Sequence, residues 1–399
     1  MNSYDAIIIG AGPAGSTAAL LLARAGWAVA IVEKAEFPRR KVCGEFISAP
    51  TLSLLAQSGV AESVLAEAGP EVREVGVYAG DRIAIGEMPR VDGAVPYGRA
   101  LGRHRLDELL LDAARTSGAT VYQPWRVESC ESCSDRYVCV LSSARGAATE
   151  ELTAPVIIAA HGSWEIGRLP LQSLRGRARD SDLLAFKTNF TGAALPAGRM
   201  PIVAFPGGYA GLVHSGEGRL SFACCIRRDS LVQCRSGAAG VSAGAAVLKH
   251  VLQTCRGLRD ALDGAVHEER WLAIGPLRPG LHGTCSEGYF AVGNALGEAH
   301  PIVGEGISMA IQSAWLLCER LLAAPRAATS ATWSAIGRDY EAAFRRNFVP
   351  RMRAASAFAS LAMHRHAAAV AAGMFAAAPA LLALAARAAG KARPLQPAR

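Results

Sequence analysis

The first 33 residues carry the pattern that most restricts the fold of this chain. An apolar run, Ala6–Ile9, meets the glycine-rich segment 10–15, which reads G-x-G-x-x-G. An Ala/Leu-rich helical stretch follows, and a second apolar run, Val29–Val32, ends in Glu33. This order of strand, glycine turn, helix, strand and acidic residue is typical of a βαβ unit that binds a dinucleotide.

The glycine turn supplies the geometry that a diphosphate needs. Gly10 allows the tight turn, Gly12 lets the backbone approach the diphosphate, and Gly15 lets the helix pack closely on the strand. Pro13 and Ala14 open the helix, whose free N–H groups and positive dipole end favour an anion. We therefore expect these five residues to bind the diphosphate.

The acidic residue at the end of the second strand selects among dinucleotides. Glu33 is placed to accept hydrogen bonds from the ribose hydroxyls, and its charge would repel a 2′-phosphate. The bound dinucleotide is therefore expected to be FAD or NAD rather than NADP. Lys34, the next residue, is expected to line the same site.

The composition indicates a large folded protein and excludes several classes of function. Of 399 residues, 51% are hydrophobic and 19% are charged, which excludes a disordered chain. The net charge is +8, but the basic residues are scattered and aromatic residues amount to only 6%, so no nucleic-acid binding is expected. A preference for anionic substrates or anionic lipid surfaces stays open.

The ten cysteines have no regular spacing, so no disulfide framework is expected. Cys130 and Cys133 form one CxxC, but neither a second CxxC nor a nearby histidine pair completes a zinc site, and no metal is expected. The first strand begins within a few residues of Met1, which leaves no room for a signal peptide. We therefore expect a reducing, cytoplasmic compartment.

The tail from Ala354 onward is rich in alanine, and residues 367–386 carry no charge, which is about the length of a membrane span. Gly373 and Pro379 interrupt this stretch, so two short helices divided at Pro379 are expected. They either pack on the body of the protein or form an apolar lid or membrane-touching surface that admits a hydrophobic substrate. The latter would place the protein at the inner face of the membrane.

Residues 293–307, GNALGEAHPIVGEGI, form a second glycine-rich segment. It looks like the GD-A-x-G-x-x-x-P-x-x-G-x-G-I motif of FAD-dependent hydroxylases related to p-hydroxybenzoate hydroxylase. The resemblance implies FAD as the cofactor, with Gly293 and Asn294 at the ribityl chain; Asn294 stands where the family has aspartate. The residues that the resemblance places at the flavin ring are Pro301, Gly304, Gly306 and Ile307.

Two more positions resemble the same family. Arg103, Leu106 and Asp107 are similar to its R-x-x-[FL]-D helix start, whose arginine lies near the FAD phosphates. Val127 falls where family members place backbone groups against the adenine. The resemblance thus implies that Arg103 and Val127 contact the cofactor.

His161 stands where these families carry an Asp-Gly pair that helps to organise FAD and NADPH contacts. His161 either substitutes for that aspartate or is a loop histidine beside the ribityl chain. The electron source is accordingly NADPH, NADH or a separate flavin reductase.

Residues 40–48, RKVCGEFIS, are similar to the CGEG-[IL]-S segment of geranylgeranyl reductases, a related family. This resemblance implies that Arg40 and Cys43 contact the cofactor. Phe205 and Pro206 match the end of the Y-x-W-x-F-P substrate motif of those reductases, and with Tyr209 they are expected in the substrate pocket. The aromatic first half of that motif is missing, which argues against an isoprenoid-shaped pocket.

The side chains expected to face the flavin ring are Cys43, Glu45, His300 and Glu305. With an ordinary pKa near 6.5, His300 could act as an acid or base at neutral pH, and a structural histidine is the alternative. Cys43 either acts as the reductase-family cysteine or is inert packing. Glu45 either faces the ring or pairs with a neighbouring basic residue, Arg40 or Lys41.

These patterns predict an α/β fold: a Rossmann-like FAD-binding domain of the glutathione-reductase type, an inserted and mostly antiparallel β-sheet substrate domain, and a C-terminal helical segment. The expected parts are FAD-binding residues 1–75, substrate-domain strands 76–98, FAD-binding residues 99–170, the substrate sheet 171–275, FAD-binding residues 276–325 and the helical region 326–399.

The motif set favours a flavin-dependent monooxygenase that uses molecular oxygen to hydroxylate a hydrophobic aromatic or polyketide-type metabolite. The alternatives are a geranylgeranyl-reductase-like enzyme that reduces carbon–carbon double bonds and a non-catalytic escort-type protein on the same fold. A flavin halogenase is disfavoured because the W-x-W-x-x-P segment of that family is absent.

Overall fold

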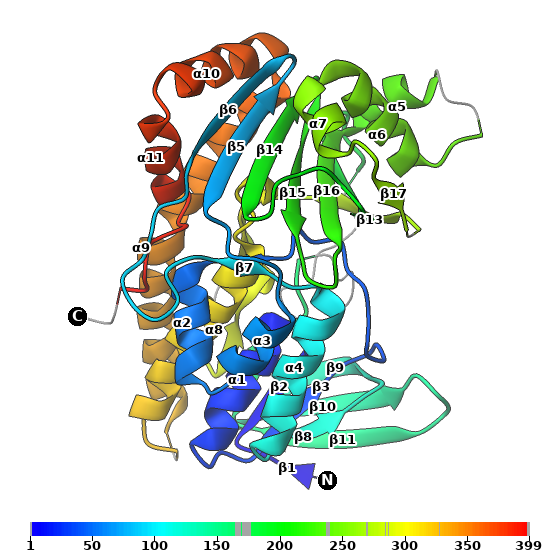
Figure 1. The fold of residues 1–399 in the computed structure, drawn as a ribbon. Helices are drawn as coiled ribbons and strands as arrows, with labels where there is room; N and C mark the ends of the chain where they lie inside the picture. The colour runs from blue at the N-terminus through cyan, green and yellow to red at the C-terminus, as the bar shows by residue number, and fades with distance from the viewer. Residues whose placement is uncertain are drawn as a thin grey trace.

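The computed structural model describes residues 2–163, 169, 177–236, 240–268, 270–283, 285, 287–326 and 328–396. Two sheets organise these residues, one in the lower and one in the upper half of the molecule (Figure 1). The predicted boundary between residues 170 and 171 lies outside the described residues. The division into domains stays a prediction.

The lower half is built on a parallel sheet of five strands. Its order is β20 (Tyr289–Ala291), β12 (Val156–Ala159), β2 (Ala6–Ile9), β3 (Val29–Val32) and β8 (Thr120–Tyr122). The residues of β2, β3 and β12 are all buried, which explains why they read as uninterrupted apolar runs. The predicted βαβ unit is therefore the centre of this sheet.

Helices and a second small sheet cover this core. The helix α1 (Pro13–Arg24) packs between α4 (Arg103–Thr116) and α8 (Gly306–Ala323). The smaller sheet has the order β1 (Asn2–Ser3), β11 (Thr149–Ala154), β10 (Arg136–Ser143) and β9 (Trp125–Cys133). The short helices α2 (Ala49–Gln57) and α3 (Ala61–Glu67) lie beside α4 and α8.

The upper half contains a mostly antiparallel sheet, as predicted. Its order is β17 (Val266–His267), β13 (Leu183–Thr191), β16 (Leu220–Arg227), β15 (Gly208–His214), β14 (Arg199–Phe205), β5 (Glu74–Ala79) and β6 (Arg82–Glu87), and β18 (Leu272–Leu277) also pairs with β13. Only β14 and β5 run parallel to each other. Strands far apart in sequence thus join one sheet, because β5 and β6 come from before α4.

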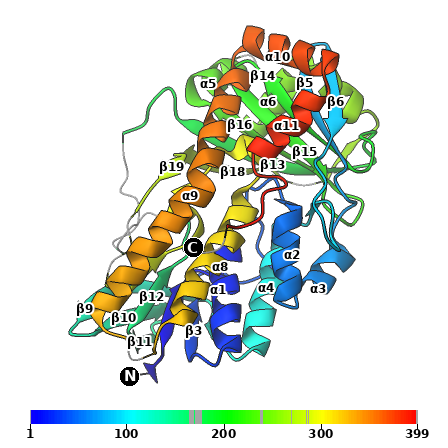
Figure 2. The ribbon, with the colours of Figure 1, turned by 90° about the vertical axis from the view of Figure 1, so that its left-hand side faces the viewer.

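The two faces of this sheet are covered differently. The helices α5 (Arg228–Ser236), α6 (Ala243–Thr254) and α7 (Arg256–Ala261) lie on the outer face, where a core forms around Phe222. The C-terminal helices α9 (Ser330–Met363), α10 (Arg365–Ala377) and α11 (Ala380–Ala388) cover the other face. Figure 2 shows α9 running along both halves of the molecule.

Short elements connect the two halves. The two-stranded pairs are β4 (Phe46–Ile47) with β7 (Arg99–Ala100) and β19 (Gly280–Leu281) with β21 (Gly297–Glu298). The 3₁₀ turns η1 (Gly293–Ala295) and η2 (Pro301–Val303) precede α8. The glycine-rich segment 293–307 therefore lies between the parallel sheet and the antiparallel one.

Candidate functional site

A cavity of about 530 Å³ opens at the carboxyl ends of the parallel strands. Ile9, Val32, Ala160 and Val292, at or next to the ends of four of these strands, line it. This is the place where open parallel sheets bind ligands. The predicted cofactor-binding residues that line it are Gly10, Gly12, Pro13, Ala14, Glu33, Lys34, Arg40, Cys43, Arg103, Val127, His161, Gly293, Asn294, Pro301, Gly304, Gly306 and Ile307.

The glycine turn has the shape that a diphosphate needs. Gly10 has φ +104°, and a Cβ there would lie 2.7 Å from the Ala160 carbonyl oxygen. A Cβ on Gly15 would lie 1.9 Å from the Gly10 carbonyl oxygen, so Gly15 acts by packing and is not in the cavity wall. At Gly12 a Cβ would meet only the Arg103 guanidinium, at 3.9 Å, and would otherwise project into free space. The free space above Gly12 lies where the helix N-terminus attracts an anion.

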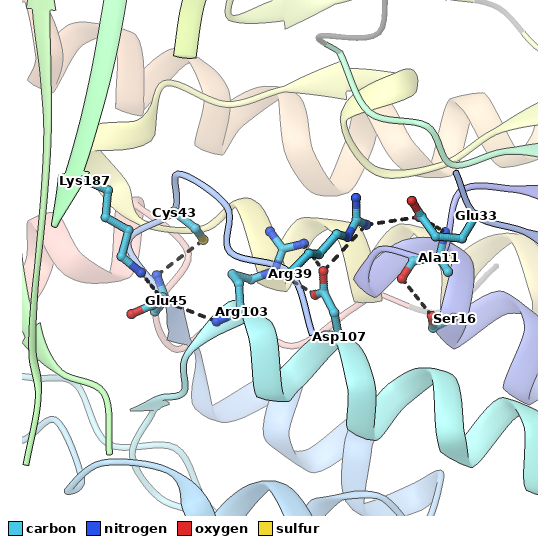
Figure 3. A network of polar contacts seen from close by, with 9 residues as sticks. All are labelled: Ala11, Ser16, Glu33, Arg39, Cys43, Glu45, Arg103, Asp107 and Lys187. Atoms are coloured by element: carbon cyan, nitrogen blue, oxygen red, sulfur yellow. Dashed lines mark hydrogen bonds and ion pairs between the residues drawn. The ribbon is translucent and has the colours of Figure 1, made fainter. Parts of the chain in front are cut away.

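Glu33 is held rigidly at the edge of this cavity. Its carboxylate accepts hydrogen bonds of 2.9 Å from the backbone N–H groups of Ala11 and Ala35. Arg39 Nη2 lies 3.1 Å from the same carboxylate and 3.8 Å from Asp107. Figure 3 draws both contacts as dashed lines. The sequence prediction missed Arg39 and expected the neighbouring Arg40 at the cofactor; Arg40 also lines the cavity.

Arg103 is fixed by the helix that it begins. Its guanidinium donates two hydrogen bonds of 2.8 Å to Asp107, one turn further along α4. Such a bidentate pair sets the plane of the guanidinium. The matched helix-start motif thus holds a positive charge at the cavity wall next to Gly12.

Lys41 adds a further positive charge that the sequence prediction did not place in the site. It lines the cavity, and burial together with the charges of Arg39 and Arg103 lowers its pKa to about 8. Glu33 and Asp107 offset two of the three positive charges of Arg39, Lys41 and Arg103, so this group keeps one positive charge beside the helix N-terminus. The cavity is therefore suited to a dianionic diphosphate.

The segment around Cys43 forms a tight turn between the two halves. Glu45 has φ +64°, and its backbone N–H points to Cys43 Sγ at 3.3 Å. The Glu45 carboxylate is buried, pairs with Lys187 of β13 and accepts a hydrogen bond from the Arg103 backbone N–H (Figure 3). Glu45 thus pairs with a basic residue that the sequence prediction did not name, and the charge of Arg40 also acts on it. Lys187, 142 residues away in sequence, takes that place because β13 passes above this turn.

His161 and Asn294 follow neighbouring strands of the parallel sheet, β12 and β20, and both line the cavity. His161 follows β12, and its ring Nδ1 lies 2.8 Å from the Gly162 carbonyl oxygen. Asn294 belongs to η1, which Gly293 fixes with φ +59° and an N–H···Oγ hydrogen bond of 2.8 Å to Ser313. Both residues line the cavity where the sequence placed them, and their roles toward a cofactor stay predictions.

A second cavity, of about 240 Å³, adjoins the first. Its wall combines the inner face of the antiparallel sheet with η2 and the helices α9, α10 and α11, and it is almost entirely apolar. The residues that line both cavities are Val42, Cys43, Gly44, Phe46, Ile274, Pro301 and Gly304. The two cavities therefore adjoin at the wall that these residues form.

The predicted substrate-pocket residues separate in the structure. Tyr209 lines the second cavity, but Phe205 does not. Phe205 is buried on the outer face of the sheet, in the core beneath α6, because successive residues of β14 point to opposite faces. Pro206 lies in the turn after β14 and lines neither cavity, so these two residues were wrongly assigned.

His300 lies behind the second cavity and does not line either of the two. It is buried, and its Nδ1 forms a 2.6 Å hydrogen bond with the Tyr209 hydroxyl. Burial lowers the pKa of His300 to about 4 and raises that of Tyr209 well above its ordinary value. His300 is therefore neutral at pH 7, and it reaches the cavity only through Tyr209.

The C-terminal segment contributes one charged group to the second cavity. Lys391, three residues beyond α11, lines it and lies 3.1 Å from Glu305 at the start of α8. No sequence pattern connected these two residues, because their approach depends on the path of three helices. In the described part of the chain no group of three or more His, Cys, Asp or Glu side chains could hold a metal ion.

The fold and the first cavity together define an α/β protein that binds a dinucleotide. The FAD binding domain family matches residues 3–335, and the chain belongs to that family. The glycine turn, the buried cationic residues and the matched late glycine segment all fit FAD, which supplies electron transfer when bound.

Two curated proteins and one solved structure illustrate the relationship. Menaquinone reductase of Mycobacterium tuberculosis (strain ATCC 25618 / H37Rv) is 31% identical over 171 residues, 42% of this chain and 40% of that protein. The 6-methylpretetramide 4-monooxygenase of Streptomyces rimosus is 25% identical over 325 residues, 79% of this chain and 55% of that protein. PqsL, a probable FAD-dependent monooxygenase from Pseudomonas aeruginosa, has a TM-score of 0.73 at 21% identity and covers 92% of this chain and 99% of its own.

The chain thus spans about two fifths of the length of the first curated relatives. The family membership shows an FAD-binding protein, and its activity is a separate question.

Proposed function

We propose that the protein is an FAD-dependent monooxygenase that hydroxylates a hydrophobic aromatic or polyketide-type small molecule in secondary metabolism. The main support is the apolar cavity that adjoins the cofactor cavity at Cys43, Pro301 and Gly304. An apolar compartment that excludes water suits an oxygen-dependent reaction, because water would divert the reactive species. The 6-methylpretetramide 4-monooxygenase is named for such a reaction, and its similarity to this protein extends over 79% of this chain.

The chain's own residues would position the two molecules. The backbone of the Gly12 turn and the side chains of Arg39, Lys41 and Arg103 would bind the diphosphate. Glu33 would accept hydrogen bonds from the ribose, replacing part of its present pairing with Arg39. Tyr209 would contact the substrate, and neutral His300 would hold the Tyr209 hydroxyl in place.

Electrons would come from NADPH, NADH or a separate flavin reductase. His161 lines the cofactor cavity and stands where the families that the sequence resembles carry an Asp-Gly pair, so direct reduction by a nicotinamide cofactor needs a test. Mixing the FAD-loaded protein anaerobically with NADPH and then NADH, and following loss of flavin absorbance, decides between a direct donor and an external reductase.

Oxygen dependence tests the reaction type. We expect oxygen consumption that depends on a bound aromatic substrate and yields a product heavier by one oxygen atom. Turnover that persists without oxygen and adds two hydrogen atoms to the substrate would contradict hydroxylation.

Reduction of a carbon–carbon double bond is the second candidate function. The observation that favours it is the position of Cys43 and Glu45, whose turn lies where the two cavities meet. A relative named menaquinone reductase is 31% identical over 171 residues. A Cys43→Ala variant that keeps its FAD but loses oxygen-independent turnover would support this reading.

We also propose that the protein works in the cytoplasm with its C-terminal helices against a membrane surface. Four large apolar side chains are exposed on α10 and α11: Val370, Met374, Leu381 and Leu384. Among the described residues no single helix is long and apolar enough to cross a membrane; only α10 and α11 together pass such a test, and they are bent by 120°. Sedimentation with anionic vesicles should be lost in a Met374→Glu/Leu384→Glu variant.

A further inference from the structure

Lys391 is placed at the junction of the two cavities by the turn that ends α11. Gly390 has φ +99°. Its N–H donates a hydrogen bond to the Arg387 carbonyl oxygen, and the Lys391 N–H donates one to the Ala386 carbonyl oxygen. This is the hydrogen-bond pattern of a helix-terminating glycine turn, and it directs the chain back toward the protein. Lys391 Nζ consequently lies 3.7 Å from where a Cβ on Gly304 would be, and Gly304 lines both cavities.

The segment after this turn is tied to the two long helices. Arg351 of α9 is buried and donates hydrogen bonds of 3.0 Å to Gln312 of α8 and to the Arg393 carbonyl oxygen. Asn347 Oδ1 accepts a 3.0 Å hydrogen bond from the Gln396 N–H. The position of Lys391 is therefore built into the fold.

The Lys391 ammonium has hydrogen-bonding capacity that the protein does not use. It is 6% exposed, pairs with the Glu305 carboxylate at 3.1 Å and lies 4.0 Å from the centre of the Phe46 ring. An ammonium carries three N–H donors. Apart from this ion pair, no group among the described residues accepts a hydrogen bond from it. A buried donor without an acceptor destabilises the protein unless a ligand supplies one.

The ion pair also restricts the kind of acceptor. Lys391 lines the cavity and Glu305 does not, so the carboxylate lies behind the ammonium. The buried Arg351 guanidinium also attracts the Glu305 carboxylate, but a substrate carboxylate would still bring a second negative charge close to Glu305. A neutral oxygen atom can accept from Lys391 without that repulsion.

We propose that Lys391 determines specificity by donating a hydrogen bond to a neutral ring oxygen, a phenol or enol hydroxyl or a quinone carbonyl, of an otherwise apolar substrate. This inference builds on the proposed function, since it names the substrate class of the apolar cavity. Glu305 is a positioning residue that orients the ammonium. The oxygen is thereby held beside Gly304, at the wall that faces the cofactor cavity.

Isothermal titration calorimetry of the FAD-loaded protein with four probes tests this proposal. The probes are 2-naphthol, 2,3-dimethyl-1,4-naphthoquinone, 2-naphthoate and 2-methylnaphthalene, which lacks oxygen. We expect 2-naphthol, the quinone or both to bind more tightly than 2-methylnaphthalene, and 2-naphthoate to bind more weakly than 2-naphthol. Tighter binding of 2-naphthol would indicate a substrate with a hydroxyl group, and tighter binding of the quinone would indicate a substrate with a carbonyl group.

The variants Lys391→Met and Lys391→Met/Glu305→Gln should lower the preference for the neutral oxygen-containing probes over 2-methylnaphthalene by about tenfold or more. This is the effect expected for loss of a charged hydrogen bond. The double variant avoids an unpaired buried carboxylate. Arg387→Met removes an exposed cation from the same segment and should leave the preference unchanged. An unchanged preference in folded Lys391 variants would overturn the proposal, as would tighter binding of 2-naphthoate or the absence of binding by every probe.

A measurement on the unaltered protein covers the case in which the variants do not fold. Bound 2-naphthol should slow amine-directed labelling of Lys391, followed by mass spectrometry, but not that of exposed Lys249. Equal labelling of Lys391 with and without 2-naphthol would refute the proposal that the oxygen atom of the probe binds at Lys391. Flavin content and oxygen-dependent turnover test the proposed function separately, because probe binding needs neither reduction nor oxygen.

Discussion

Neighbouring glycines of one motif act through different physical causes at the residue scale. A Cβ at Gly15 would collide with the Gly10 carbonyl oxygen, whereas a Cβ at Gly12 would point into the cofactor cavity. We predict that Gly15→Val destabilises the fold, while Gly12→Val folds with near-native thermal stability and loses bound FAD. Circular dichroism melting and the ratio of flavin to protein absorbance separate the two effects. A Gly12→Val protein that retains full FAD would contradict this assignment.

The charge of Lys41 gives FAD binding a defined pH dependence. Burial and the neighbouring arginines lower its pKa to about 8 in the protein without cofactor, and a bound diphosphate would raise it. Below pH 8 the free protein already carries the proton. Above pH 8 binding must take one up, so the Kd for FAD should rise with pH, by at most about tenfold per pH unit.

Fluorescence titration of FAD between pH 6.5 and 9.5 measures this effect. Lys41→Met should flatten the rise, and Lys41→Arg, which stays charged, should also remove it while keeping tight binding. A rise that persists unchanged in Lys41→Met would assign the titration to another group.

The ion pair between Lys187 and Glu45 is buried on both sides. Removal of one partner leaves an uncompensated buried charge, so Lys187→Met should lower the free energy of unfolding by about 3–5 kcal/mol. Urea denaturation measures the change, and Lys249→Met, at an exposed site on α6, is the control. A loss no larger than in the control would show that the pair contributes little.

At the scale of elements, the contact of α11 with β6 closes the apolar cavity. A Cβ on Gly86 of β6 would lie 2.9 Å from the Pro379 carbonyl oxygen and 3.0 Å from Leu382 Cβ. We predict that Gly86→Val displaces α11 and costs about 1–3 kcal/mol of stability. Hydrogen exchange of residues 380–389 should increase, whereas Gly146→Val, in open space, should leave it unchanged.

At the scale of the whole molecule, the cofactor cavity joins segments from both halves. Residues from Ile9 to Ala310 line it, so ligand binding should stabilise the protein as a unit. At a free FAD concentration of 100 times Kd, the free energy of unfolding should rise by about 2.7 kcal/mol. Riboflavin, which lacks the diphosphate and adenosine, should give a smaller rise at equal concentration. Equal effects of both ligands would argue against the Gly12 turn as a diphosphate site.

Much of the fold follows from local pattern. The predicted helix start at Arg103, the apolar strands Ala6–Ile9 and Val29–Val32 and the division of the tail at Pro379 all appear in the structure. The substrate pocket was harder to predict. Phe205 and Tyr209 are close in sequence, but the alternation of strand residues puts them on opposite faces of one sheet.

The sequence by itself determined the dinucleotide unit, because its strand, turn, helix and Glu33 lie within 33 residues and their spacing fixes their geometry. Only the tertiary structure decided that Glu45 meets Lys187 and that Lys391 meets Glu305. Those pairs are joined by the packing of whole strands and helices. No local periodicity records which distant side chains that packing brings together.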